Sequence, residues 1–164
     1  MKEEFIYYLW ENRLLHLDLK TTDNEEITVL SVGNRNHDSG ADFVNARIKI
    51  GDALWAGQVE IHVRASDWFK HNHHNDANYD SVILHVVYEN DTDSLKIPTL
   101  EIKDKFDISI FHKYSWFLNS RNWIPCGEFV GGVQNFTVIS WLDRMLVEHL
   151  ENECKELDFK LKNN

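Results

Sequence analysis

Residues 40–63 read GADFVNARIKIGDALWAGQVEIHV, and this stretch decides the fold of the chain. Two runs with the composition of strands, 43–50 and 54–63, flank the dipeptide Gly51-Asp52. Glycine and aspartate tolerate the positive φ angles that the centre of a tight hairpin turn requires. The stretch therefore predicts two antiparallel strands joined by a short turn.

The segments on either side of this hairpin predict an α/β fold. Residues 3–15 place apolar side chains at helical spacing, and residues 26–32 alternate like a strand. Residues 82–88 are apolar except for His85, which is typical of a central strand covered on both faces. The remaining predicted elements are a short helix capped by Ser66, a strand over residues 99–102, and helices over residues 107–119 and 135–157.

This order of elements predicts a restriction-endonuclease-like α/β fold, in which helices flank a central mixed sheet of four to five strands. We expect an α/β core domain over residues 1–105 and a helical C-terminal extension over residues 106–164. A chain of 164 residues with 43% hydrophobic content can bury one core of this kind.

Composition limits the class of protein further. No apolar run reaches the roughly 18 residues that a membrane span needs, and the first residues lack the apolar segment of a secretory signal. We therefore expect a cytoplasmic protein with no membrane partner. Cys126 and Cys154 form no Cys-x-x-Cys pair, which argues against a disulfide framework and against a thiolate zinc site.

The net charge of the chain indicates which kinds of molecule it can bind. Lys and Arg total 17 and Asp and Glu total 27, so the net charge is −10. Proteins that bind nucleic acid usually carry the opposite balance, because contacts to phosphates dominate their affinity. The acidic balance supports a non-catalytic interaction or scaffold domain as an alternative to any nuclease.

The leading candidate site combines Asp42, Glu60 and His62. Side chains alternate along a strand, so Glu60 and His62 must share one face, and Asp42 stands at the entrance of the neighbouring strand. Seventeen residues separate Asp42 from Glu60. This pattern is similar to the site of PD-(D/E)XK nucleases, which assemble a metal site from two neighbouring strands. A polar strand edge and a turn aspartate would show the same residues without any chemistry.

The resemblance implies a role for each of these residues. Asp42 and Glu60, with the backbone carbonyl of Ile61, would form an oxygen-rich metal site suited to Mg or Mn. His62 stands where such sites usually carry a lysine, and it would orient or activate the attacking water. Asp38 and His85 are supporting candidates. The function expected from this pattern is a metal-dependent, nuclease-like phosphodiesterase acting on nucleic acid.

A histidine-rich loop offers an alternative metal site. His71, His73 and Asp76 could converge on one ion, and imidazole and carboxylate ligands suit zinc. This loop predicts a zinc-dependent hydrolase, with the simpler alternative that the histidines are solvated. His85 differs, because its apolar strand predicts a buried, neutral histidine with a supporting role toward His62 or Glu60.

Longer motifs connect the chain to a known family. The chain resembles the bacterial domain of unknown function 2851 family over nearly its whole length. The motifs that carry the resemblance are GADFVNARI (40–48), WAGQVEIH (55–62), Ser66-Asp67-Trp68 followed by His71 and His73, and YDSVILHVV (79–87). That family has no established activity, so the resemblance implies no substrate.

The chain departs from the family pattern in one position. The family usually reads Gly-Pro-Asp-Phe where this chain has Ala41, although the carboxylate of Asp42 remains. The resemblance also implies a longer protein, of which this chain is an amino-terminal portion or a naturally short version. The run Trp68-x-x-His71-x-His73 is also similar to very-short-patch repair endonucleases, whose PD-(D/E)XK-like site uses aspartate and histidine.

The last predicted helix carries a stripe of apolar side chains, which we expect another surface to shield from water. Exposed apolar strips of this length are uncommon on monomers and usually mark an interface. We expect a homodimer in which this helix pairs with its copy across a two-fold axis. The stripe consists of Ile139, Leu142, Met145, Leu146 and Leu150.

Overall fold

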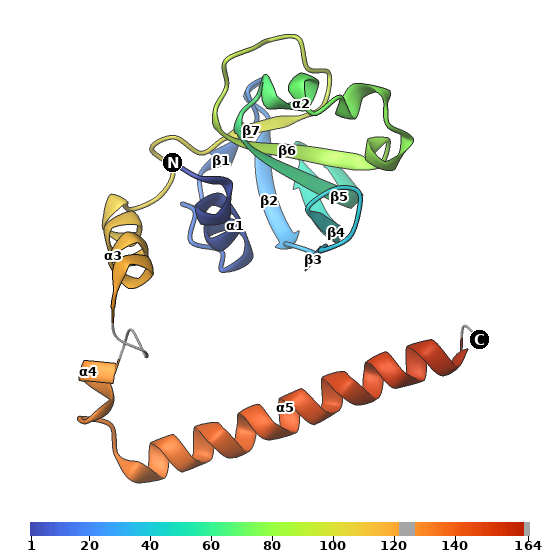
Figure 1. The fold of residues 1–164 in the computed structure, drawn as a ribbon. Helices are drawn as coiled ribbons and strands as arrows, with labels where there is room; N and C mark the ends of the chain where they lie inside the picture. The colour runs from blue at the N-terminus through green and yellow to red at the C-terminus, as the bar shows by residue number, and fades with distance from the viewer. Residues whose placement is uncertain (122–126, 163–164) are drawn as a thin grey trace. The chain divides into compact units, whose positions relative to one another are not determined.

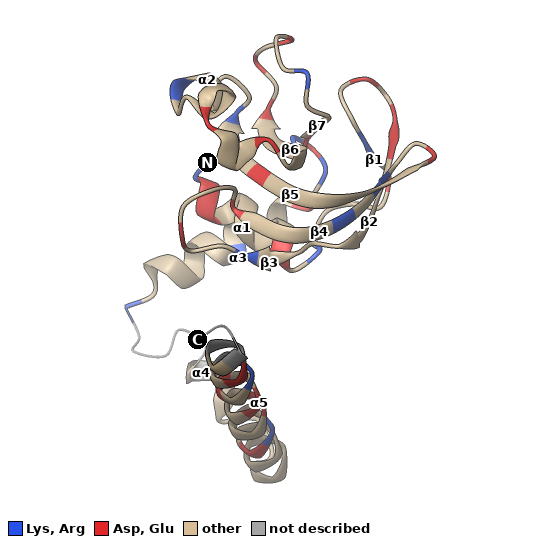
Figure 2. Cartoon of the chain, turned by 90° about the vertical axis from the view of Figure 1, so that its right-hand side faces the viewer, with Lys and Arg blue, Asp and Glu red and all other residues tan. Residues whose placement is uncertain are grey.

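A computed structural model describes residues 1–121 and 127–162 of the chain (Figure 1). The chain divides into two compact units, Met1–Ser115 and Trp116–Asn164. The first unit is a mixed α/β structure with helices on a mixed sheet, as the sequence predicts. Figure 2 shows acidic and basic positions interspersed over the strands of this unit.

The sheet has seven strands in the order β1-β2-β4-β5-β6-β7, and β3 pairs with β4 outside this path. The predicted count of four to five strands is too low, because the two-residue strands β1 and β3 also join the sheet. The strands are β1 (Leu19–Lys20), β2 (Glu26–Ser31), β3 (Asn34–Arg35), β4 (Phe43–Ile50), β5 (Ala53–Arg64), β6 (Val82–Glu89) and β7 (Thr99–Glu101).

The β4–β5 hairpin confirms the prediction made from its sequence. The two strands are antiparallel, with Ile50 opposite Ala53. Gly51 adopts a φ of +55°, a left-handed conformation that glycine reaches without steric cost. Strand β6 then runs parallel to β5, and it is buried along most of its length, as its apolar sequence predicts.

A close approach of two backbones fixes how β5 and β6 pair. A Cβ atom on Gly57 would lie 2.5 Å from Cγ2 of Ile83 and 2.6 Å from the carbonyl oxygen of Ser81. The adjacent Gln58 N–H donates to the same carbonyl at 2.9 Å. Any larger residue at position 57 would push the strands apart at the start of their pairing.

Helix α1 (Glu3–Glu11) buries its apolar face against one side of the sheet. Phe5 and Leu9 lie in the main core together with Val59 and Ile61 of β5. The helix ends before the predicted residue 15, because Arg13 adopts a left-handed φ of +53°. Helix α3 (Ile108–Asn119) adds partly buried side chains to this core through residues 110–114.

Short elements cover the other side of the sheet (Figure 1). They are helix α2 (Asp67–Lys70) and the 3-10 turns η1 (His73–Asn75) and η2 (Ala77–Tyr79). Trp68 of α2 packs on Ala41 and Val82 in a second, smaller apolar cluster. Ser66 stands at the predicted N-cap position of α2, but its side chain makes no capping hydrogen bond, because its hydroxyl donates to Oδ2 of Asp91 at 2.7 Å.

The second unit contains α4 (Gly127–Val130) and the long helix α5 (Asn135–Lys162). The apolar stripe predicted for dimerisation lies on α5, and other elements of this unit leave its side chains exposed. Cys154 is exposed with a free thiol, and Cys126 lies outside the described residues. Among the described helices, none combines the length and apolar character needed to cross a membrane.

Candidate functional site

The site begins with the alternation of side chains along β5. Val59 and Ile61 point into the main core, where they are 0% and 1% exposed. Glu60 and His62 therefore point to the opposite face, where Oε1 of Glu60 lies 3.6 Å from Nε2 of His62. The prediction that these two side chains share a face is confirmed. Both are buried, at 5% and 1% exposure.

Asp42 joins this pair from the start of β4. Its backbone N–H donates to Oε2 of Glu60 at 3.1 Å, and its Oδ2 accepts a hydrogen bond from the N–H of Ile61 at 2.9 Å. The structure thus brings Asp42, Glu60 and His62 together, as expected from the sequence. The carboxylate of Glu60 is thus bonded to the backbone of Asp42, and the carboxylate of Asp42 is bonded to the backbone of β5.

Tyr7 completes the surroundings of Asp42. Its hydroxyl donates to Oδ1 of Asp42 at 2.9 Å, and the guanidinium of Arg35 lies 4.5 Å from the centre of its ring. Burial, followed by the charge of Asp42, raises the pKa of Tyr7 above its ordinary range. Each carboxylate oxygen of Asp42 therefore accepts one hydrogen bond. The sequence analysis missed Tyr7, because nothing in the helical pattern of α1 relates it to position 42.

The chain after β5 brings two more histidines to the same place. Helix α2 ends at Lys70, and Asn72 then adopts a left-handed φ of +62° between His71 and His73. Asparagine is among the residues that adopt this conformation most readily. The resulting turn lets both histidine rings contact the ring of His62, with centroids 4.9 Å and 5.3 Å away.

The ring nitrogens of these histidines converge. Nε2 of His62 and Nδ1 of His71 form a hydrogen bond of 3.0 Å. Nε2 of His73 lies 3.2 Å from Oε1 of Glu60, without the alignment of a hydrogen bond. One nitrogen from each of His62, His71 and His73 lies within 4.8 Å of the other two. These three side chains, with Glu60 beside them, are the residues that could hold a metal ion.

His85 supports His62 from the neighbouring strand. The parallel register places His85 of β6 opposite Glu60 of β5. Its Nε2 shares a hydrogen bond of 2.8 Å with Nδ1 of His62, and the residue is fully buried. The expected proximity of His85 to His62 is thus present in the structure. Its other nitrogen, Nδ1, has no hydrogen-bond partner within the described part of the chain.

Burial controls the protonation of the site. It raises the pKa of Glu60 to about 8, with a further contribution from the charge of Asp42. Burial and, after it, the neighbouring histidines together lower the pKa of His62 to about 2 and that of His85 to about 4. At neutral pH these two imidazoles are neutral, and Glu60 is close to the point at which it exchanges a proton.

Two expected residues make local hydrogen bonds in their own loops. Asp38 is exposed in the loop before β4, where its backbone N–H donates to the side-chain oxygen of Asn36 at 3.0 Å. Asp76 accepts a hydrogen bond from the N–H of Asn78 at 3.0 Å and thereby caps η2. The loop therefore contributes His71 and His73 to the cluster, and Asp76 has a local structural role.

Aromatic side chains hold the histidines in place. Tyr79 stacks on the ring of His73 with a centroid distance of 3.8 Å and an angle of 28° between the planes. Trp68 is 4% exposed and packs against His73 and His85, with centroid distances of 5.3 Å and 5.4 Å. This packing restricts the rotation of His73 toward solvent.

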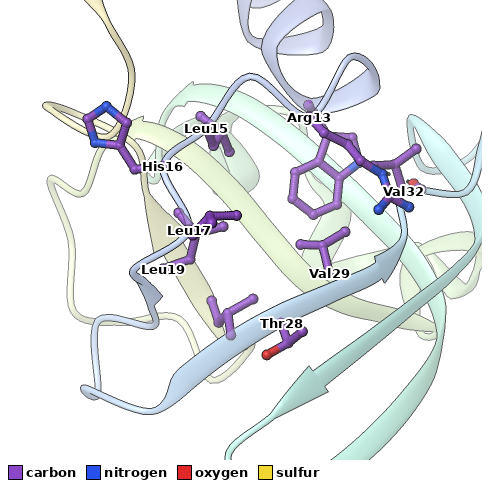
Figure 3. Close-up of a pocket in the computed structure, with 10 residues that line it drawn as sticks. Arg13, Leu15, His16, Leu17, Leu19, Thr28, Val29 and Val32 are labelled. Atoms are coloured by element: carbon purple, nitrogen blue, oxygen red, sulfur yellow. Dashed lines mark hydrogen bonds between the residues drawn. The ribbon is translucent and has the colours of Figure 1, made fainter.

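A hollow of about 370 Å³ adjoins the cluster. Trp68, His73 and Tyr79 form one side of it, and residues 94–97 form another. A second pocket, of about 160 Å³, lies between the segment after α1 and strand β2 (Figure 3). Its lining includes Arg13 and His16 but none of the clustered histidines. Of these two pockets, the hollow of about 370 Å³ is therefore the one that borders the histidine cluster, through His73.

Comparison with known proteins identifies the family. No curated protein and no solved structure matches the chain, so these comparisons supply neither an activity nor a fold. Residues 3–164 match the family model DUF2851, which is described as a protein of unknown function. The chain therefore belongs to the DUF2851 family, as the motifs around Asp42, Glu60 and His62 predict.

Proposed function

We propose that this chain is a cytoplasmic, metal-dependent hydrolase of phosphodiester bonds, in which Glu60 accepts a proton from the attacking water. The orientation of Glu60 carries the proposal. One of its oxygens is fixed by the backbone of Asp42, and the other faces the rings of His62 and His73. A carboxylate held in this way, with a pKa of about 8, is suited to proton transfer near neutral pH.

The residues of the cluster have different roles in the proposed reaction. Glu60 is the proton acceptor, and Asp42 positions it through the hydrogen bond from its backbone N–H. A divalent ion at the histidines would lower the pKa of a water molecule and neutralise charge on the phosphate. Such an ion would also favour the ionised form of Glu60 over the protonated form.

The arrangement of strands supports the phosphodiester as substrate. Asp42 stands at the entrance of β4, and Glu60 and His62 lie on the antiparallel strand β5. This order is similar to that of PD-(D/E)XK nucleases, and the parallel strand β6 that follows supports a restriction-endonuclease-like core. The net charge of −10 favours a short oligonucleotide over a long duplex, since an acidic surface gains little from many phosphates.

Hydrolysis assays test the proposal directly. Metal-stripped protein is reloaded with Zn²⁺, Mn²⁺ or Mg²⁺ and offered bis(p-nitrophenyl) phosphate or a fluorescent single-stranded oligonucleotide. We expect metal-dependent cleavage, with kcat about 10²- to 10⁴-fold lower in Glu60→Gln. The control is Glu89→Gln, which removes a carboxylate at the end of β6 that pairs with Lys103.

Two results would contradict the proposal. Equal rates in Glu60→Gln and the wild-type chain would remove Glu60 from the reaction. Failure of all three metals to support hydrolysis, in protein shown to bind metal, would favour the non-catalytic interaction domain instead.

A further inference from the structure

The spacing of the three histidine nitrogens is close to that of a metal site. In a tetrahedral zinc site with bonds of about 2.0–2.1 Å, neighbouring nitrogens lie roughly 3.3 Å apart. The observed pair His62 Nε2 and His71 Nδ1 is 3.0 Å apart, and all three nitrogens lie within 4.8 Å of one another. The widest spacing, up to 4.8 Å, would have to shorten by about 1.5 Å for all three nitrogens to bind one ion.

His73 provides a second and independent observation. Its side chain is 10% exposed, and its Nε2 has no hydrogen-bond partner within the described residues. Its nearest polar neighbour is Oε1 of Glu60 at 3.2 Å, which is not aligned for a hydrogen bond. Buried polar atoms normally have an aligned partner, so this nitrogen beside the histidine cluster is consistent with a ligand between them. Tyr79 stacks on the ring and keeps it in this orientation.

The hydrogen bond between His62 and His85 matches the surroundings of metal-binding histidines. A histidine that binds metal through one nitrogen usually donates a hydrogen bond from the other. Nδ1 of His62 lies 2.8 Å from Nε2 of the fully buried His85. When Nδ1 of His62 donates this hydrogen bond, its Nε2 presents a lone pair toward His71 and His73.

Asp42 is held in place by two hydrogen bonds in this arrangement. Its Oδ1 accepts from Tyr7 and its Oδ2 accepts from the N–H of Ile61. Each carboxylate oxygen keeps a second lone pair, so these bonds fix the orientation of Asp42 without blocking it. The histidine nitrogens, however, are the group whose mutual spacing approaches that of a metal site. Nitrogen-rich ligand sets favour zinc and related transition metals, whereas Mg²⁺ requires a shell of oxygen ligands.

We infer that His62, His71 and His73 form a tri-histidine site for zinc or a related divalent transition metal, with Glu60 beside the open fourth position. Three protein ligands and one open position are the arrangement of catalytic zinc sites. His85 is a positioning residue that orients His62. The inference rests on the proposed function only for the role of Glu60, since the metal site itself is defined by the histidines.

Calorimetric titration of Zn²⁺ into the metal-stripped full chain tests the site. We expect one zinc ion per chain and much weaker binding of Mg²⁺. His71→Ala should weaken zinc binding at least 10-fold, and the double variant His71→Ala/His73→Ala should abolish the site. His71 is exposed, so its replacement leaves the buried core intact, and circular dichroism checks that the fold is kept.

Two variants serve as matched controls. His74→Ala removes an exposed imidazole from the same loop, whose ring packs on Phe69, and should leave zinc affinity unchanged. Asp42→Asn keeps the histidines and should retain zinc. Co²⁺ is the spectroscopic probe, since a tetrahedral histidine site gives intense visible absorption bands that His71→Ala should remove.

The outcomes separate this inference from the proposed function. Unchanged zinc affinity in the double variant would overturn the tri-histidine site, as would loss of zinc binding in Asp42→Asn with full binding in His71→Ala. Zinc binding without hydrolysis would leave the site in place and overturn the proposed function. Hydrolysis supported by Mg²⁺ in a chain that binds no zinc would overturn the tri-histidine site and leave the proposed function in place.

Discussion

Asp42 and Glu60 are fixed to each other across the β4–β5 hairpin, because the backbone N–H of Asp42 donates to Oε2 of Glu60 at 3.1 Å. The carboxylate of Asp42 in turn accepts from the N–H of Ile61, next to Glu60. The pair is therefore part of the strand pairing as well as part of the site. Changes at Asp42 are expected to affect stability before they affect metal affinity.

The first prediction concerns the hydrogen bond between Tyr7 and Asp42. Tyr7→Phe removes the 2.9 Å bond to Oδ1 and leaves the ring in place. Bonds to charged groups contribute about 1.5–3 kcal/mol, so urea denaturation should show a loss of that order. Zinc affinity should stay unchanged. The control is Tyr8→Phe on the same helix, whose side chain is 39% exposed.

The second prediction concerns pH and the metal-stripped protein. The pKa of Glu60 is raised from 4.5 to about 8 in the folded state, so its contribution to stability is lost as pH rises through about 8. The pKa values of His62 and His85 are lowered from 6.5, so their contribution is lost as pH falls below that value. Unfolded histidines are still partly protonated just above pH 6.5 and oppose the effect of Glu60 there, so the window that isolates Glu60 is about pH 7.5 to 8.5.

Glu60→Gln provides the measurement for this window. The unfolding free energy of the wild-type chain should decline from about pH 7.5 to 8.5, by at most about 1.4 kcal/mol per pH unit. The decline should disappear in Glu60→Gln and remain in Glu89→Gln. A wild-type free energy that is flat across this window would show that Glu60 is already ionised there.

The third prediction concerns the pairing of β5 with β6. Gly57→Ala would place a methyl group 2.6 Å from the carbonyl oxygen of Ser81, and a backbone atom cannot rotate away. Overpacking of this kind costs about 1–3 kcal/mol. Zinc affinity should also fall, since the register that places His85 opposite Glu60 begins here. Gly131→Ala is the control, because its Cβ would meet no described atom within 4 Å.

The fourth prediction concerns the apolar stripe of α5. Leu142 and Leu146 are 64% and 58% exposed, and we propose that a second copy of the chain covers them. Light scattering at micromolar concentration should give twice the chain mass of 19.4 kDa for the wild type. Leu146→Glu should give a single chain mass. A wild-type chain that remains at 19.4 kDa at high concentration would rule out the dimer.

Local patterns were sufficient to predict the centre of the fold. The hairpin follows from Gly51 and its flanking strands, and the shared face of Glu60 and His62 follows from strand alternation alone. The burial of β6 follows from its apolar sequence. These features depend on neighbours in the chain or on a single strand pairing, so periodicity reveals them.

The remainder of the site depends on contacts between distant segments. The loop histidines were identified, but their approach to His62 depends on where α2 ends and on the left-handed Asn72. The bond from Tyr7 to Asp42 spans 35 positions and leaves no periodic signal. The expected carboxylate metal pair differs from the proposed histidine site because the sequence cannot show that nitrogens of His62, His71 and His73 lie within 4.8 Å of one another.

The three linked imidazoles also connect the interior of the protein to bulk water. His85 is fully buried, His62 is 1% exposed and His71 is exposed, and the links between them are 2.8 Å and 3.0 Å long. A proton can pass along such a line by successive exchange of tautomers, without any opening of the sheet. Zinc bound between His62 and His71 would replace their hydrogen bond and close this path. Loading with metal would then slow the exchange of the buried His85 proton with solvent, which NMR can follow at a single ring.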